Sequence, residues 1–237
     1  MPRVMVWDVP VRLFHVLFGV GIVVASAIAL LGDEDAPLYP YHMLIGLTLA
    51  LMVGLRIVWG FVGTRYARFG SFLFSPGQVL GYFSALLRGS PQRHIGHNPG
   101  SAYAILAMFA LAIGLAVTGL MMENEVAKDL HEIMAYAMVA VVAAHVVGVA
   151  VHTVVHRENI TRSMVDGRKE ATAGDAISHI RPIAALVSLA VVAAFAVMIV
   201  RDYDPIARTT RMPLVGMSVA LGESEGGERG GRERDDD

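Results

Sequence analysis

Residues 130–154 read LHEIMAYAMVAVVAAHVVGVAVHTV, and this stretch decides the class of fold. As a helix rising 1.5 Å per residue, it is long enough to cross a hydrocarbon core of about 30 Å. Similar apolar stretches lie at 10–31, 41–63, 101–122 and 182–200. The chain is 55% hydrophobic and only 17% charged, with a mean hydropathy of +0.55. We therefore predict an all-α integral membrane protein with five transmembrane helices.

The composition excludes several classes of protein. There is no cysteine, so disulfides, iron–sulfur clusters and thioether-linked haem are excluded. A formal net charge of −2 offers no basic surface for nucleic acid. The first apolar stretch is long enough to span a bilayer, and we interpret it as a transmembrane helix rather than a cleavable signal peptide.

The charges between the apolar stretches predict the orientation in the membrane. The loops around 32–35 and 123–129 are acidic, with Lys128 as their one basic residue. Because basic residues concentrate on the cytoplasmic side, we expect the N-terminus to be cytoplasmic and the C-terminus extracytoplasmic. The opposite connections carry the basic residues Arg3, Arg12, Arg65, Arg68, Arg88, Arg93, Arg157, Arg162, Arg168, Lys169 and Arg181.

Three regions follow from this pattern. Residues 1–170 are expected to form a four-helix transmembrane domain, 171–200 a connection and fifth transmembrane helix, and 201–237 an extracytoplasmic tail. The tail from Gly222 to Asp237 is rich in Gly, Glu, Arg and Asp and is expected to be disordered. The apolar but interrupted segment Phe69–Leu87 is expected to be an interfacial amphipathic helix.

Four of the nine histidines lie at apolar positions within the spans, where an ionisable side chain is costly. A lone histidine there is more often part of an interhelical hydrogen bond. Here, however, His131 and His145 are fourteen residues apart, which places both on nearly one helix face and about 21 Å apart along the axis. By depth, His15 pairs with His145 and His42 pairs with His131. Two stacked bis-imidazole sites are what transmembrane electron transfer requires.

Several other residues allow two interpretations. His152, seven residues after His145, is an alternative inner ligand. Arg56 and Arg12 are either arginines that extend to the membrane surface or partners of haem propionates. Small residues follow three of the histidines, as a planar macrocycle requires, although ordinary helix packing also uses glycine; they are Gly19, Gly46 and Gly148.

The remaining residues of interest are expected to be ordinary surface or interface groups. Trp7 and Trp59 suit an interfacial aromatic belt. The other histidines fall in connections or at a helix boundary and are expected to be solvated; they are His94, His97, His156 and His179.

Separated motifs resemble one family. Residues 6–15 read VWDVPVRLFH, and 59–63 read WGFVG. Together with LHE at 130–132, HVVG at 145–148 and MVDGRK at 164–169, they resemble the bacterial cytochrome b561 and nickel-hydrogenase b-type cytochrome family. The resemblance implies a four-helix bundle over about 4–170, electron exchange with quinone or a redox partner, and two non-covalent haems b on His15, His42, His131 and His145.

The leading hypothesis is therefore an electron-transfer subunit in a bacterial cytoplasmic membrane, working between the quinone pool and a c-type cytochrome, a hydrogenase or a dehydrogenase. Whether it is an enzyme in its own right, and whether it forms a homodimer, stay open. One alternative is a self-contained superoxide/quinone oxidoreductase. Another is a haem-free transporter with a histidine-lined path, which would need carboxylates beside the histidines, and Glu132 is almost the only one within the spans.

Overall fold

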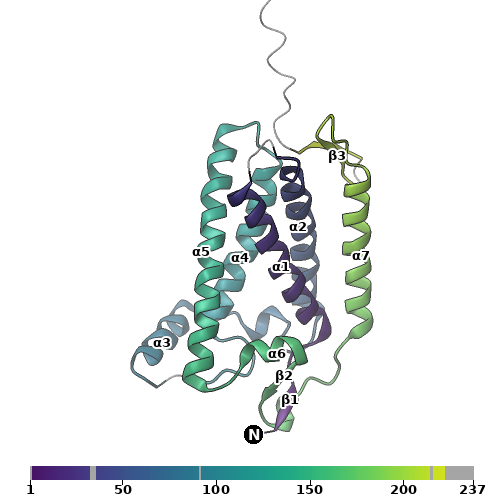
Figure 1. The fold of residues 1–237 in the computed structure, drawn as a ribbon. Coiled ribbons are helices and arrows are strands. Elements are labelled where there is room, and N and C mark those ends of the chain that lie inside the picture. Colours follow the sequence, from purple (N-terminus) through teal and green to yellow (C-terminus); the bar gives the residue numbers. More distant parts are fainter. Residues whose placement is uncertain (1, 33–35, 91, 214–215, 222–237) are drawn as a thin grey trace, which may run out of the picture.

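The computed structural model describes residues 2–32, 36–90, 92–213 and 216–221 (Figure 1). Among these, five helices are long and apolar enough to cross a membrane, which confirms the five predicted spans. They are α1 (Val9–Leu31), α2 (Tyr39–Val62), α4 (Pro99–Gly119), α5 (Glu125–His156) and α7 (Pro182–Arg201). The shorter elements are β1 (Arg3–Met5), η1 (Phe69–Ser71), α3 (Pro76–Leu87), α6 (Ile160–Asp166), β2 (Arg168–Glu170), η2 (Ala173–Asp175), β3 (Thr209–Arg211) and β4 (Ser218–Ala220).

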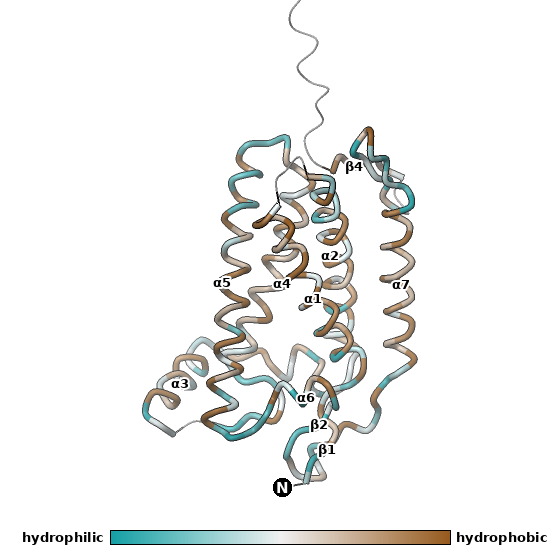
Figure 2. The backbone as a smooth tube through the Cα atoms, viewed as in Figure 1, coloured by the Kyte–Doolittle hydropathy of each residue, from teal (hydrophilic) through white to brown (hydrophobic). Residues whose placement is uncertain are grey.

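Helices α1, α2, α4 and α5 form a bundle, and α7 lies outside it against α1 and α2 (Figure 1). The bundle is held together by a core of buried apolar side chains that includes Phe18, Val53, Phe109 and Met138, one from each helix. The outward faces are apolar as well, and the middle of the long helices is hydrophobic (Figure 2). An apolar exterior at this depth is expected for helices that face lipid.

The two ends of the bundle differ in structure. The lower end in Figure 1 holds β1, β2, α3 and α6, where α1 starts and α5 ends. Strands β1 and β2 pair antiparallel, with Val4 opposite Lys169. The carbonyl of Gly167 accepts hydrogen bonds from the N–H groups of Val6 and Trp7 at 2.8 and 3.0 Å. This glycine has φ +76°, and a Cβ there would lie 2.8 Å from the Trp7 carbonyl oxygen, so the position requires glycine.

The upper end carries a small hairpin of β3 and β4 that sequence reasoning did not foresee. Leu221 and Ile199 are fully buried there against Leu44 and Leu47 of α2. This core anchors α7 to the bundle at its upper end. The predicted disordered segment from Gly222 lies outside the described residues.

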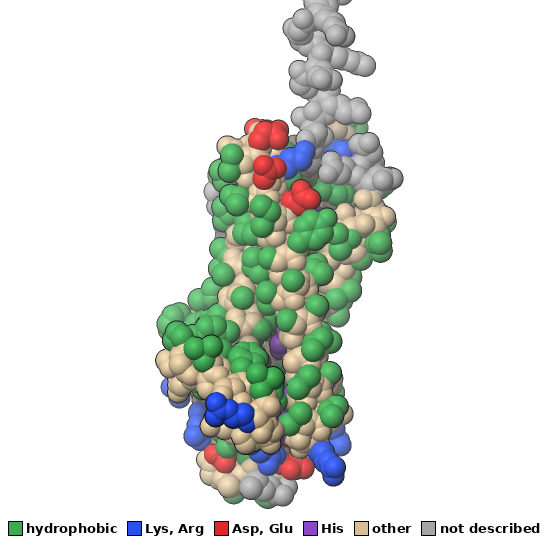
Figure 3. Space-filling view, turned by 90° about the vertical axis from the view of Figure 1, so that its left-hand side faces the viewer, with side chains coloured by type: hydrophobic (Ala, Val, Ile, Leu, Met, Phe, Trp, Pro, Cys, Tyr) green, Lys and Arg blue, Asp and Glu red, His purple; other side chains and the backbone are tan. Residues whose placement is uncertain are grey.

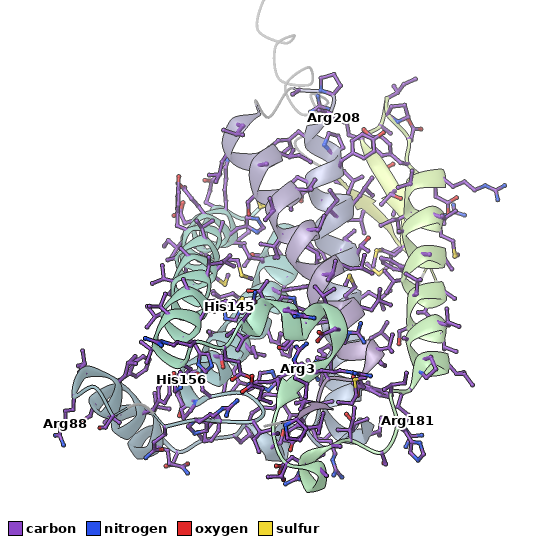
Figure 4. The ribbon with its side chains drawn as sticks, turned by 60° about the horizontal axis from the view of Figure 1, so that its bottom comes forward. Arg3, Arg88, His145, His156, Arg181 and Arg208 are labelled. Atoms are coloured by element: carbon purple, nitrogen blue, oxygen red, sulfur yellow. The ribbon has the colours of Figure 1, made fainter. Side chains whose placement is uncertain are left out.

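Most of the basic side chains visible in Figure 3 lie at the lower end, together with some acidic ones, and acidic and basic side chains both lie near the upper end. Arg3, Arg88 and Arg181 lie at the lower end, while Arg208 lies at the upper end (Figure 4). Arg208 belongs to the tail after α7, so the upper end is not free of basic residues.

Three of the five membrane-spanning helices begin at side-chain caps. Asp8 accepts a hydrogen bond from the N–H of Val11, Asn98 from Ser101, and Asn124 from Ala127. Such caps satisfy N–H groups that the helix itself leaves unpaired. The first predicted span, 10–31, thus agrees with α1 to within one residue, and α3 supplies a helix within the predicted interfacial segment.

Both tryptophans, which were expected to lie in an interfacial aromatic belt, make hydrogen bonds at the lower end of the bundle. Trp7 is buried and its Nε1 donates to Ser163 Oγ at 3.3 Å. Trp59 donates through Nε1 to Asp8 Oδ2 at 3.0 Å. Each therefore joins segments that are distant in the sequence.

Candidate functional site

The structure brings together the histidine pairs that depth predicted. The rings of His15 on α1 and His145 on α5 have centroids 6.5 Å apart, and those of His42 on α2 and His131 on α5 are 6.2 Å apart. We call these the lower pair and the upper pair. His145 lies on the side of α5 that faces the other helices (Figure 4). Because α5 contributes one histidine to each pair, it sets their separation along the bundle.

The spacing within each pair suits a metal held between two imidazoles. Each iron–nitrogen bond is about 2 Å and each nitrogen lies roughly 1 Å from its ring centroid, so two axial imidazoles place their centroids about 6 Å apart. The observed 6.5 and 6.2 Å match this spacing at both depths. The residues present therefore fit two bis-histidine haems.

Hydrogen bonds orient both rings of the upper pair. Nδ1 of His42 lies 2.9 Å from the carbonyl oxygen of Ala25, and since a carbonyl only accepts, Nδ1 carries the proton. Nδ1 of His131 lies 3.0 Å from Oγ1 of Thr118, whose own proton is directed to the Gly114 carbonyl at 2.9 Å. His131 Nδ1 is therefore also a donor. Both Nε2 atoms keep the lone pair that an axial ligand needs.

The glycines near the histidines leave room beside them. A Cβ built at Gly19, Gly46 or Gly148 would meet no atom within 4 Å. Gly114 and Gly21 differ, because a Cβ there would lie 2.7 Å from Met134 Sδ and 2.6 Å from Leu49 Cδ2. The first three glycines thus border open space, which fits the planar group that the sequence suggested.

His152 belongs to neither pair. It is buried, with 5% of its surface exposed, and its ring lies 4.3 Å from that of His156. Its Nε2 is 4.0 Å from Oε2 of Glu158. The structure thus places His145, and not His152, opposite His15.

The two arginines named from the sequence lie at the lower end. Arg56 is 5% exposed, and its Nη2 donates to the Ala67 carbonyl at 3.1 Å, while Nη1 is buried without a partner. Arg12 donates to the Val165 carbonyl, and its Nε is likewise buried without a partner. Within the described ranges, the buried side-chain polar atoms that lack a hydrogen bond belong to Arg12, Arg56, His97, His152, His156 and Glu158.

His97 is a residue that sequence reasoning missed, because it was expected to be solvated. Its ring lies between those of Trp7 and Phe72, with both centroids 4.7 Å away, and its Nδ1 is buried. Burial, and then the charges of Arg56 and Lys169, lower the pKa of His97 to about 3. The one sequence signal was its position next to the cap Asn98, which ties it to the start of α4.

Five apolar helices and two depth-separated histidine pairs define a multi-pass membrane protein of the b-type cytochrome class. The chain belongs to the prokaryotic cytochrome b561 family, whose model matches residues 6–167 and which implies haem b as the cofactor and electron transfer as the role. This confirms the resemblance seen in the motifs. Helix α7 and the tail lie beyond the matched residues.

Two relatives have the same description, "Probable Ni/Fe-hydrogenase B-type cytochrome subunit". The protein from Rhizobium leguminosarum bv. viciae is 23% identical over 70% of this chain and 88% of its own length. That from Bradyrhizobium diazoefficiens is 22% identical over 71% of this chain and 87% of its own. No solved structure matches the chain.

Proposed function

We propose that the chain is a di-haem electron-transfer subunit of a cytoplasmic membrane. The observation that carries this proposal is the presence of two histidine pairs at different depths, each with the ring spacing of a bis-imidazole site. His15 and His145 would ligate one haem b, and His42 and His131 the other. Two centres stacked through the bundle provide a route for electrons across the bilayer.

When bound, haem b supplies a one-electron couple of its iron. The chain itself performs the other tasks. In the four-helix bundle α5 packs against α4, α4 against α2 and α2 against α1, and this packing keeps the spacing of each histidine pair. Ala25 and Thr118 orient the upper imidazoles. The apolar walls exclude water, which favours electron transfer without competing reactions.

Positive groups at the lower end complete the lower site. Haem carries two propionate carboxylates, and a buried guanidinium is a strong partner for a carboxylate. Arg56 has a buried Nη1 that lacks a partner, and Arg12 has such an Nε. We propose that Arg56, supported by Arg12, balances the propionates of the lower haem. The basic connections at this end support a cytoplasmic N-terminus, with the C-terminus on the opposite side.

A hydrogenase is the proposed redox partner, because both relatives are described as hydrogenase cytochrome subunits. A c-type cytochrome or another dehydrogenase would use the same two centres. The proposed lipid-soluble carrier is a quinone. A small, open apolar cavity between α1, α2 and α7 offers a wall suited to contact with its ring, formed by residues including Leu13, Phe14, Met52, Trp59, Leu189 and Val192.

The test is a reduced-minus-oxidised optical spectrum of the detergent-purified protein with a pyridine haemochrome count. Two low-spin haems b per chain are expected. A chain that contains no haem after expression with adequate haem supply would refute the proposal. A single haem would leave one histidine pair without its proposed role.

The partner is tested separately in membranes that contain this chain and the Ni/Fe hydrogenase of the same cell. Hydrogen gas is expected to reduce both haems, and deletion of the hydrogenase is expected to abolish that reduction. Reduction that persists without the hydrogenase would point to a dehydrogenase instead.

A further inference from the structure

His97 has an unusual environment for a residue in a connection between helices. The aromatic rings of Trp7 and Phe72 both contact its imidazole, each in a tilted arrangement with a centroid distance of 4.7 Å, and we call this arrangement the aromatic clamp. Trp7 is 3% exposed and Phe72 1% exposed, so this clamp is part of the packed lower end. The ring orientation is therefore set by packing, and yet Nδ1 is buried with no hydrogen-bond partner.

An unpartnered polar atom at such a position is costly unless a ligand pairs with it. The pKa of His97, lowered to about 3 chiefly by burial, keeps the ring neutral at physiological pH. A neutral imidazole can carry its proton on Nδ1 and donate one hydrogen bond there.

The groups around His97 show what kind of ligand would accept that bond. Its electrostatic neighbours are Arg56 from α2, Lys169 from β2, His145 from α5 and His15 from α1. Two of the four are cations, and two form the lower pair. Among these neighbours there is no carboxylate, and Nη1 of Arg56 also lacks a partner. A partner for these two buried atoms would be an anionic group that accepts hydrogen bonds and lies close enough to the lower histidine pair to share its electrostatic environment.

We propose that Nδ1 of His97 donates a hydrogen bond to a propionate carboxylate of the haem held by His15 and His145, and that it thereby positions this haem and raises its midpoint potential. The inference rests on the proposed function. A hydrogen bond withdraws negative charge from the carboxylate, so the ferric iron loses some of its stabilisation. His97 is a positioning residue, since it acts on the iron through the propionate.

The experiment compares His97→Phe, His97→Leu and His97→Asn in the haem-containing protein by redox titration and resonance Raman spectroscopy. The Phe and Leu variants remove the donor, and Phe keeps a ring between Trp7 and Phe72. Both are expected to lower the midpoint of one haem, leave the other unchanged and shift the propionate bending mode. Asn places its amide N–H near the position of Nδ1 and is expected to restore both values.

His94→Phe is the matched control. His94 lies in the same connection, and its Nδ1 is 3.2 Å from the Gln92 carbonyl rather than next to the histidine pair. Both midpoints are expected to stay unchanged in it. Wild-type midpoints in a haem-containing Phe or Leu variant would overturn the inference while leaving the proposed function intact. Loss of both haems from all three variants, Asn included, would also overturn it, because His97 would then have only a packing role.

Discussion

The indole Nε1 of Trp59 donates a 3.0 Å hydrogen bond to Oδ2 of Asp8 and so joins the end of α2 to the start of α1. The same oxygen accepts from Thr64 Oγ1 at 2.7 Å, while Oδ1 accepts from the Val11 N–H at 3.0 Å. The carboxylate is 1% exposed. The buried side chain of Asp8 thus caps α1 and also connects it to Trp59 and Thr64 at the end of α2.

Asp8→Ala is therefore expected to destabilise the protein by about 2–4 kcal/mol, since it removes a cap and leaves two part-buried donors without their acceptor. Thermal unfolding in detergent, followed by haem absorbance, measures this. Ser75→Ala is the control, because Ser75 caps the exposed helix α3 and its loss should cost about 1 kcal/mol. Equal losses of stability in the two variants would contradict the role given to Asp8.

Thr118→Val is expected to weaken the upper haem selectively. It removes the hydroxyl that orients His131, and loss of such a partner typically costs about tenfold or more in ligand affinity. The measurement is haem content and the midpoint of each haem. Thr153→Val is the control, because Thr153 makes the same bond to the carbonyl four residues before it, at 2.8 Å, and none to a histidine. A change in the lower haem alone would argue against the assignment.

Removing single histidines tests the pairing. His15→Ala and His145→Ala are each expected to abolish the same haem, and His42→Ala and His131→Ala the other. His152→Ala is expected to keep both haems, since its ring lies against His156. Haem counts and low-temperature spectra of each variant decide this. Loss of a haem from His152→Ala, with both kept in His145→Ala, would reverse the assignment of the lower ligand.

Gly167→Ala is expected to destabilise the lower end by roughly 1–3 kcal/mol, because a residue with a Cβ is strained at φ +76°. Its Cβ would also lie 2.6 Å from Met5 Sδ. Limited proteolysis of the N-terminal segment and thermal unfolding report the loss. Gly174→Ala provides the comparison, since the nearest atom to its Cβ would be 3.9 Å away. If the N-terminal segments of the two variants resisted proteolysis equally, β1 would not depend on Gly167.

Leu189→Trp is expected to slow the rate at which a short-chain quinol reduces the haems several-fold, because the indole would fill the cavity between α1, α2 and α7. Stopped-flow reduction of the purified protein measures the rate. Val187→Trp is the control, since Val187 is 58% exposed and does not line the cavity. Equal rates in the two variants would place quinone exchange elsewhere.

The spans and the histidine pairing could be predicted because both depend on local properties. Apolar runs long enough to cross a bilayer are visible in any window of about 20 residues. The depth of His15, His42, His131 and His145 follows from helical rise and from the alternating direction of successive spans. Neither argument requires knowing which side chains touch.

The contacts of the lower end could not be predicted in this way. Trp7 meets Ser163 across 156 residues, and Trp59 meets Asp8 across 51, so no local pattern signals either bond. Both were consequently expected at the membrane surface. The position of His97 between Trp7 and Phe72 depends on three separate segments in the same way.

The sequence by itself determined the membrane class, the five helices and the order in depth of the four histidines, because hydropathy and helical rise act over neighbouring residues. Only the tertiary structure decided that His145 rather than His152 faces His15, that Thr118 orients His131 and that His97 is enclosed. These depend on how helices rotate and pack against one another. That packing is set by side chains far apart in the chain.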